Sequence, residues 1–279
     1  MILSIVTINY NDAVGLKRTL NSVLSQSCAD IEHCIVDGAS SDDSVDVIKW
    51  YLEDAVAKGI TVKWVSERDS GIYNAMNKGI RMASGEYLQF LNSGDCLYSD
   101  SVVERMCGEL IDGEKSPILY GNMIKNISVK RRVRDRGFYG RQATFLDFYT
   151  GTLNHSSAYI KRSLFDKYGL YDETLRIVSD WKWYLQVLIM GGEQIRYVDI
   201  DVTLFDMNGV SNTDSTLDKS ERKQVLESMF PPALLLDYAT FAFPISQIKR
   251  LKRYGWAYRI VYFFERCLFK WDKWVGSNG

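Results

Sequence analysis

Two aspartates stand directly after short apolar runs that are typical of buried strands. Asp95 closes the stretch Gly85–Asp95, in which residues 87–91 are almost all large and apolar. Asp37 follows the apolar run 34–36 and precedes a glycine. Carboxylates at the carboxyl ends of parallel strands lie where open α/β sheets bind their ligands. Both side chains are therefore candidates for ligand chemistry.

The two carboxylates suit different ligands. Asp95 can hold Mg²⁺ or Mn²⁺, which bind carboxylate oxygens together with substrate phosphates, and such a cation neutralises the charge on a leaving diphosphate. Asp37 can accept hydrogen bonds from a nucleobase N–H or a ribose hydroxyl. Each also has a purely structural interpretation. Asp95 can belong to a Ser-Gly-Asp turn, and Asp37 can form a turn beside Asp42 and Asp43, either of which can cap the next helix.

A third aspartate, Asp180, precedes an aromatic segment, 181–190, that we expect to be helical. A helix cap is the commonest role for such an aspartate, but its carboxylate can also act as a general base on an acceptor hydroxyl. His155 precedes an expected strand, 156–160, and a lone histidine is more often a structural hydrogen-bonding group than a base. The polar segment Glu67–Gly79 adds a helix start, which is a natural anion site.

Composition narrows the class of protein. The 279 residues are 46% hydrophobic and 25% charged, with a net charge of −1, which argues against a general nucleic-acid binder. Five scattered cysteines without a Cys-x-x-Cys pair predict reduced thiols in a cytoplasmic protein. We see no signal peptide and no run of about 18 apolar residues, so we expect neither a secretion signal nor a spanning helix.

The elements that position these side chains follow from periodicity. Strand and helix patterns alternate four times, which predicts an α/β fold with a mainly parallel, Rossmann-like, doubly wound central sheet. No Gly-x-Gly-x-x-Gly follows the first strand, so the dinucleotide fingerprint is absent. In this part of the chain we expect strands at 2–8, 34–36, 60–65 and 87–91 and helices at 16–24, 44–58 and 72–83.

The pattern changes after Asp95. The basic stretch 125–141 fits a solvated hairpin, which we favour, or a surface that faces a diphosphate or lipid headgroups. In this second part we expect helices at 101–110 and 162–168, strands at 118–120, 196–198 and 202–205, and a polar loop at 208–218.

The C-terminal residues 254–275 form an amphipathic helical pattern. Its apolar side holds Trp256, Ile260, Phe264, Cys267, Leu268, Trp271 and Val275. Four cations gather beside that side, namely Arg259, Arg266, Lys270 and Lys273. This composition suits a helix in a membrane interface and, equally, a helix packed on its own domain or a partner subunit.

Taken together, and in their order along the chain, these motifs resemble those of family 2 glycosyltransferases, which have the A-type nucleotide-sugar-binding fold. The matching stretches are Ser4–Asn11, Ile35–Asp42, Ser66–Ile80 and Gly85–Asp95, followed by Asn154-His-Ser-Ser and Ser179-Asp-Trp. The resemblance covers roughly residues 1–215 and is most similar to bacterial enzymes of surface-polysaccharide assembly.

The resemblance implies a role for each site residue. Asp180 would be the catalytic base, and Asp95 would bind Mn²⁺ or Mg²⁺. The chain departs from the family's Asp-x-Asp motif at Ser93, where a carboxylate is usual, so we expect weak metal binding without donor. The residues implied for nucleotide or sugar are Thr7, Asn9, Asp37, Asp69, Asn92, Ser93 and His155.

The implied protein is an inverting, metal-dependent glycosyltransferase. It would move one sugar from a nucleotide donor, expected to be a UDP-sugar, to a hydroxyl of a lipid-linked or oligosaccharide acceptor. We expect it on the cytoplasmic side, with a peripheral contact to anionic membrane. Residues 1–120 would bind the nucleotide sugar, 121–215 the acceptor, and 216–279 would form a helical, amphipathic extension. Two alternatives stay open, a nucleotide-sugar-binding protein without transferase activity and a sugar nucleotidyltransferase.

Overall fold

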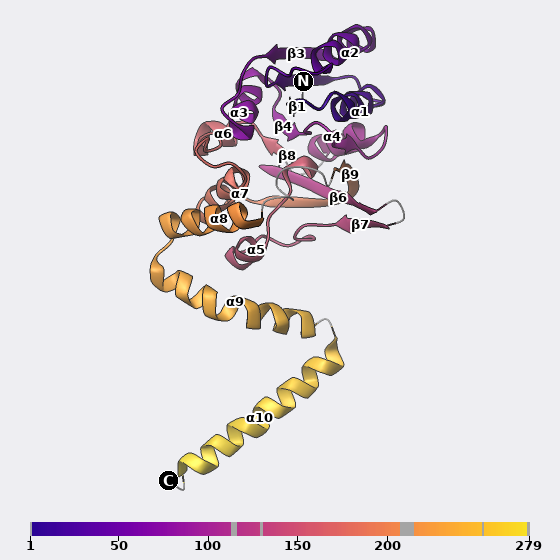
Figure 1. Cartoon of the computed structure of the whole chain (residues 1–279). Coiled ribbons are helices and arrows are strands. Elements are labelled where there is room, and N and C mark those ends of the chain that lie inside the picture. The colour runs from indigo at the N-terminus through magenta and orange to yellow at the C-terminus, as the bar shows by residue number, and fades with distance from the viewer. Residues whose placement is uncertain (1, 113–115, 129–130, 207–214, 253, 278–279) are drawn as a thin grey trace. The chain divides into compact units, whose positions relative to one another are not determined.

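The computed structural model describes residues 2–112, 116–128, 131–206, 215–252 and 254–277. The chain forms two compact units, Met1–Val225 and Leu226–Gly279. The strands that the structure describes lie in the first unit, and the second unit is helical (Figure 1).

The first half of the sheet is parallel, with the strand order β3-β2-β1-β4. Its strands are β1 (Leu3–Asn9), β2 (Ile31–Asp37), β3 (Thr61–Ser66) and β4 (Tyr87–Phe90). The connecting helices are α1 (Ala13–Leu24), α2 (Ser44–Lys58) and α3 (Ile72–Met82). Figure 1 shows α1 and α2 on one side of these strands and α3 on the other. The strand order reverses between β1 and β4, which is where doubly wound sheets bind ligands.

Burial explains why the apolar runs of this half are strands. β2 is buried at every residue because both faces of the parallel sheet are covered there, and its polar residues Glu32 and His33 are hydrogen-bonded inside the fold. α3 packs closely on β1 at Gly79, where a Cβ would collide with the side chain of Val6. The glycine therefore lets helix and strand approach each other.

The second half of the sheet is mixed. β8 (Ala158–Lys161) pairs antiparallel with both β4 and β6 (Ile118–Ser128), and β9 (Ile195–Phe205) runs parallel to β6. Two strands complete it, β5 (Cys96–Leu97) against β9 and β7 (Arg131–Asp135) against β6. The helices here are α4 (Val102–Asp112), α5 (Phe145–Thr150), the 3₁₀ turn η1 (His155–Ser157), α6 (Ser163–Tyr168), α7 (Ser179–Tyr184) and α8 (Ser215–Met229).

The predicted α/β fold is confirmed, and the differences lie mainly in this second half. The strands expected at 196–198 and 202–205 are one strand, β9, and the segment 181–190 is α7 followed by the π-helix η2 (Leu185–Met190). β6 extends to Ser128, eight residues beyond the expected end, because it pairs with β7 and β9 there.

Two further expectations concern polar segments. The stretch 125–141 contains the antiparallel β6–β7 pair, and the arginines of β7 are exposed, in keeping with a solvated hairpin. Of the loop expected at 208–218, residues 208–214 lie outside the described part of the chain. Residues 215–218 belong instead to α8, because Asp218 pairs with Arg222 one helical turn later.

The second unit contains α9 (Pro232–Lys252) and α10 (Gly255–Ser277). Within the described residues, neither these nor other helices are long and apolar enough to span a bilayer. The five cysteines are free thiols.

A series of buried hydrogen bonds links Thr7, His33 and Tyr51 in the parallel half of the sheet. Thr7 donates its hydroxyl proton to the carbonyl of Leu91 at 2.7 Å, so it accepts from Nε2 of His33 at 2.9 Å. Nδ1 of His33 then accepts from the Tyr51 hydroxyl at 2.7 Å. Burial lowers the pKa of His33 to about 3, so the ring stays neutral in the folded protein.

This histidine makes stability depend on pH. The folded pKa of about 3 is below the ordinary histidine pKa of 6.5, so the unfolded chain binds the extra proton as pH falls below 6.5. Between pH 5.5 and 4, the wild type should lose about 1.4 kcal/mol more per pH unit than His33→Gln. Urea unfolding across this range measures both slopes. Equal slopes would show that His33 is protonated in the folded state.

Candidate active site

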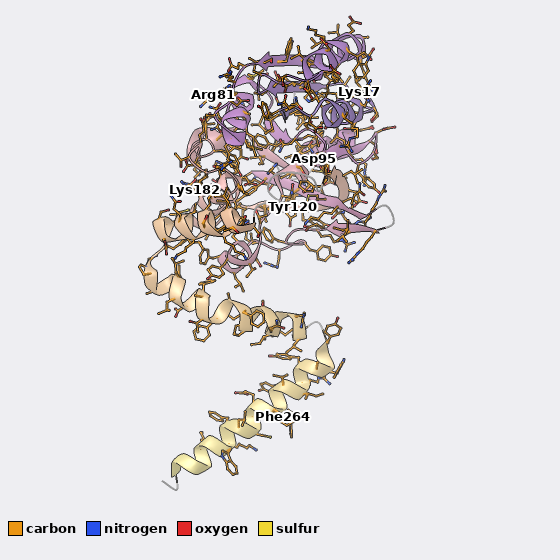
Figure 2. The ribbon with its side chains drawn as sticks, viewed as in Figure 1. Lys17, Arg81, Asp95, Tyr120, Lys182 and Phe264 are labelled. Atoms are coloured by element: carbon orange, nitrogen blue, oxygen red, sulfur yellow. The ribbon has the colours of Figure 1, made fainter. Side chains whose placement is uncertain are left out.

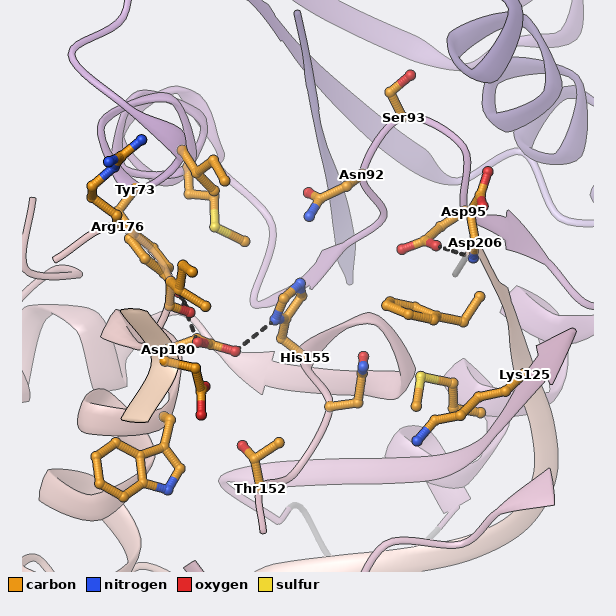
Figure 3. Close-up of a pocket in the computed structure, with 18 of the residues that line it drawn as sticks. Tyr73, Asn92, Ser93, Asp95, Lys125, Thr152, His155, Arg176, Asp180 and Asp206 are labelled. Atoms are coloured by element: carbon orange, nitrogen blue, oxygen red, sulfur yellow. Dashed lines mark hydrogen bonds and ion pairs between the residues drawn. The ribbon is translucent and has the colours of Figure 1, made fainter. Parts of the chain in front are cut away.

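A cavity of about 390 Å³ opens near the carboxyl end of β4. Its walls come from the loop after β4, α3, η1, α7, α8 and the end of β9 (Figure 3). Carboxylates outnumber cations along it, so it favours bound positive charge. Its charged lining residues are Asp12, Asp95, Asp135, Asp180, Asp206, Asp218, Lys125, Arg176 and Arg222.

Asp95 is a buried carboxylate at one end of this cavity. It is 4% exposed, and its Oδ1 accepts a 2.8 Å hydrogen bond from the backbone N–H of Asp206. Burial raises the pKa of Asp95 to about 7, and the Asp206 N–H offsets only part of that rise. A nearby cation would therefore stabilise the ionised form.

Ser93 stands at the position where the resemblance predicts a carboxylate, and its side chain contacts the carboxylate of Asp12. Its hydroxyl donates to Oδ2 of Asp12 at 3.0 Å, while Oδ1 of Asp12 accepts from the backbone N–H of Gly15 and caps α1. Both Ser93 and Asp12 line the cavity. The fold thus places the carboxylate of Asp12, which follows β1, beside Ser93, which follows β4.

Asp180 lies at the other side of the cavity and uses both carboxylate oxygens. The Tyr73 hydroxyl donates to Oδ1 at 2.8 Å, and Nδ1 of His155 lies 3.0 Å from Oδ2. Burial acts to raise the pKa of Asp180, but the hydrogen bonds from His155 and Tyr73 outweigh it and lower the pKa. The group is thus ionised at neutral pH, as a general base requires. Figure 3 shows His155 between Asp180 and Asp95.

Asp37 lies at the carboxyl end of β2, in register with Asn9 of β1, but it is not part of the cavity lining. Its carboxylate is buried and accepts hydrogen bonds from Asn9, from the backbone and hydroxyl of Ser40, and from Ser66. Burial acts to raise the pKa of Asp37, and these donors together lower it. The four acceptor positions of the carboxylate are occupied by protein groups.

The other predicted nucleotide residues divide between the two places. Asn92, Ser93 and His155 line the cavity with Asp95 and Asp180. Thr7, Asn9 and Asp69 do not.

Near Asp37, Asp69 pairs with Lys78 at 2.7 Å, and its Oδ2 would lie 3.1 Å from a Cβ on Gly38. Asp37, Asn9 and Asp69 therefore form a group of their own, whereas the Thr7 hydroxyl is committed to the core.

The polar segment Glu67–Gly79 has mostly structural contacts. Asn77 donates to the carbonyl of Tyr171 at 2.8 Å and accepts from its N–H at 3.0 Å, as a neighbouring strand would. Asn74 and Asn77 both donate to Glu173. These contacts fix α3 to the chain segment that leads into α7 and Asp180.

Several lining residues escaped the sequence analysis, among them Tyr73, Asp12, Asp206 and Arg176. In the structure Asp12 caps α1, and Tyr73 is a buried residue of α3. Their positions in the cavity depend on contacts between residues far apart in the chain. The available signal for Asp12 and Asp206 was their place shortly after a strand, and for Tyr73 its place inside the polar segment, whereas Arg176 carried no such signal.

The cavity offers part of the ligand set that a metal ion would need. In the ranges that the structure describes, no group of three or more His, Cys, Asp or Glu side chains is arranged to hold a metal ion. Mg²⁺ and Mn²⁺ sites, however, are commonly built from one or two carboxylates plus substrate phosphates. Asp95 fits that requirement, and Asp206, whose backbone N–H contacts Asp95, could add a second carboxylate, although its Oδ2 also pairs with Arg18 at 2.9 Å.

The chain is similar in sequence and in fold to known glycosyltransferases. Residues 4–169 match the model of glycosyl transferase family 2. A PGL/p-HBAD biosynthesis glycosyltransferase of Mycobacterium tuberculosis is 28% identical over 213 residues, 75% of this chain and 79% of the relative.

Two solved structures share the fold. S. aureus TarS 1-349 with UDP gives a TM-score of 0.61 at 19% identity, covering 74% of this chain and 60% of that one. The mannosyltransferase PcManGT from Pyrobaculum calidifontis, in complex with GDP-Man and Mn²⁺, gives 0.60 at 16% identity, covering 86% and 69%.

The fold and the motifs thus define an A-type glycosyltransferase domain. The chain belongs to glycosyl transferase family 2, and its enzyme class is glycosyltransferase.

Proposed function

We propose that the protein is an inverting, metal-dependent glycosyltransferase that moves one sugar from a UDP-sugar to a hydroxyl of a lipid-linked or oligosaccharide acceptor in bacterial polysaccharide assembly. The observation that carries this proposal is that an ionised, hydrogen-bonded Asp180 and a buried Asp95 line one cavity. A base and a site for a leaving diphosphate are the two parts that a direct displacement needs.

The residues divide the reaction between them. Asp180 takes the proton of the acceptor hydroxyl as that oxygen attacks the anomeric carbon of the donor sugar. The bond from this carbon to the diphosphate breaks, and the nucleoside diphosphate leaves on the Asp95 side. A single displacement inverts the anomeric configuration, so no second carboxylate has to act as a covalent nucleophile.

Asp95, together with Asp206, would hold the Mn²⁺ or Mg²⁺ ion. When bound, such an ion neutralises charge on the leaving diphosphate. The raised pKa of Asp95 supports this role, because a carboxylate that burial makes hard to ionise gains most from a nearby cation.

The nucleotide would lie toward Asp37, Asn9 and Asp69. Asp37 would exchange a serine hydroxyl for a nucleotide donor, since Ser40 and Ser66 occupy its oxygens through rotatable hydroxyls. The UDP bound by TarS and the parallel-sheet crevice support a nucleotide at this edge. We place the protein on the cytoplasmic side of the membrane.

Asp180→Asn tests the central assignment. The amide cannot take a proton but keeps the size of the side chain, so transfer should fall by about 100-fold or more. UDP affinity should stay within about twofold. UDP release from a panel of UDP-sugars and calorimetry with UDP measure the two effects.

Asp54→Asn, on the exposed face of α2, serves as the matched control and should behave as wild type. Wild-type turnover in Asp180→Asn would remove the base role. If the wild-type protein binds UDP but turns over none of the nucleotide sugars, that result would instead favour a nucleotide-sugar-binding protein without transferase activity.

Metal removal tests Asp95. Excess chelator should abolish transfer, and added Mn²⁺ or Mg²⁺ should restore it. Mn²⁺ alone should bind weakly and UDP should strengthen its binding, because phosphate oxygens complete the ligand set. Asp95→Asn should weaken Mn²⁺ binding in the presence of UDP by at least tenfold, measured by calorimetry. Full activity in chelator would take the metal out of the proposal.

The membrane contact would come from the second unit. α10 exposes large apolar side chains, including Trp256 at 70%, Phe264 at 61% and Trp271 at 62%. Figure 2 shows the side chains along this helix, with Phe264 labelled. Exposed aromatic residues interspersed with Arg259, Arg266, Lys270 and Lys273 are typical of helices at anionic bilayer surfaces.

We expect the full chain to bind phosphatidylglycerol-containing vesicles more tightly than pure phosphatidylcholine vesicles. Arg266→Glu with Lys270→Glu should weaken that binding at least tenfold, since each cation near the surface contributes about 1 kcal/mol. Lys49→Glu with Arg105→Glu, two exposed cations of the first unit, is the matched control. Vesicle sedimentation gives the affinities. Equal binding by both double variants would assign α10 to protein packing.

A further inference from the structure

Glu221 of α8 is a buried carboxylate beyond the residues that match the family model. It is 6% exposed and accepts hydrogen bonds from three consecutive backbone N–H groups, those of Arg176 at 2.7 Å, Ile177 at 2.9 Å and Val178 at 3.3 Å. A buried carboxylate is costly unless donors surround it, and bonds to a charged acceptor are strong. The side chain therefore fixes the backbone of 176–178 to α8.

The same segment is held by α3. The Tyr73 hydroxyl donates its single proton to the carboxylate of Asp180, and it also lies within hydrogen-bond distance of the carbonyl oxygen of Ile177. Asp180 follows Val178 by two residues and lies in the first turn of α7. The position of the proposed base thus depends on one residue of α3 and one of α8.

α8 also contacts the chain immediately after Asp180. The guanidinium of Arg222 lies 4.5 Å from the centroid of the Trp181 ring, and its Nε donates to Asp218. Arg222 and Asp218 are part of the cavity lining, as is Trp181. The helix therefore holds the segment on both sides of Asp180 in sequence.

We propose that Glu221 is a positioning residue for Asp180, which makes α8 an integral part of the transfer site. This inference rests on the proposed role of Asp180 as base. Without the Glu221 carboxylate, the N–H groups of 176–178 lose their acceptor and Asp180 moves relative to the acceptor hydroxyl. A displacement of about 1 Å can cost about 100-fold in rate. Nucleotide binding, which uses residues after β2 and β4, should not change.

Glu221→Gln tests the proposal against Glu227→Gln, the same change at an exposed position of the same helix. For Glu221→Gln we expect kcat for transfer to fall about 10- to 100-fold, with UDP affinity within about twofold of wild type. Amides 176–178 should exchange hydrogen faster, as seen by mass spectrometry, while β1 and β2 keep their protection. Glu227→Gln should match the wild type in all three measurements.

The double variant Asp180→Asn/Glu221→Gln separates the two proposals. If Glu221 acts through Asp180, the double variant should be no slower than Asp180→Asn alone. An additive loss, or a wild-type kcat in Glu221→Gln while Asp180→Asn is impaired, would overturn the positioning role and leave the base role intact. Wild-type turnover in Asp180→Asn would instead overturn the base role.

Glu221→Asp covers the case in which the glutamine variant does not fold. It keeps the charge and shortens the side chain by one methylene, so it should show faster exchange at 176–178 and a smaller loss of kcat. Faster exchange with an unchanged kcat would contradict the proposal.

Discussion

The carboxylate of Asp180 is hydrogen-bonded to two residues, one from each half of the domain. Tyr73 belongs to α3, which leads into the parallel strand β4, whereas His155 precedes β8 of the mixed half. Because the carboxylate is buried, it has to be compensated, and these two donors provide the compensation. The same bonds lower its pKa. The contacts that hold the two halves together at this point therefore also keep the proposed base ionised.

The parallel half was predictable because each of its strands contains a short apolar run, and polar residues follow it. The mixed half was less predictable, since charged residues recur along strands such as β7 and β9. β9 was expected as two strands because Asp199 and Asp201 interrupt the apolar pattern. In the fold, Asn122 of β6 donates to both carboxylates at 2.9 Å, so the strand continues through them. A compensation between residues 77 and 79 positions apart is invisible to local periodicity.

The residues of the site likewise divide into those that the sequence indicated and those that only the fold reveals. Asp95, Asp180 and His155 could be singled out because each follows or precedes a recognisable element, and the fold places all three on one cavity. Tyr73 and Glu221 act through hydrogen bonds that span 107 and 43 to 45 residues, respectively, so their side-chain types alone carried no signal. Asp37 was correctly placed at a strand end, but only the structure reveals that serine and asparagine donors already fill its oxygens.

The π-helical segment Leu185–Met190 directly follows α7. Such a segment winds more residues into each turn than an α-helix does, so it changes the direction in which later side chains point. Here Asp180, which precedes this segment, lines the cavity, while Val187 and Leu188 within the segment are buried. One residue corresponds to about 100° of rotation in an α-helix. The extra residue in this turn therefore offsets the direction of the side chains that follow it from the direction of those in α7.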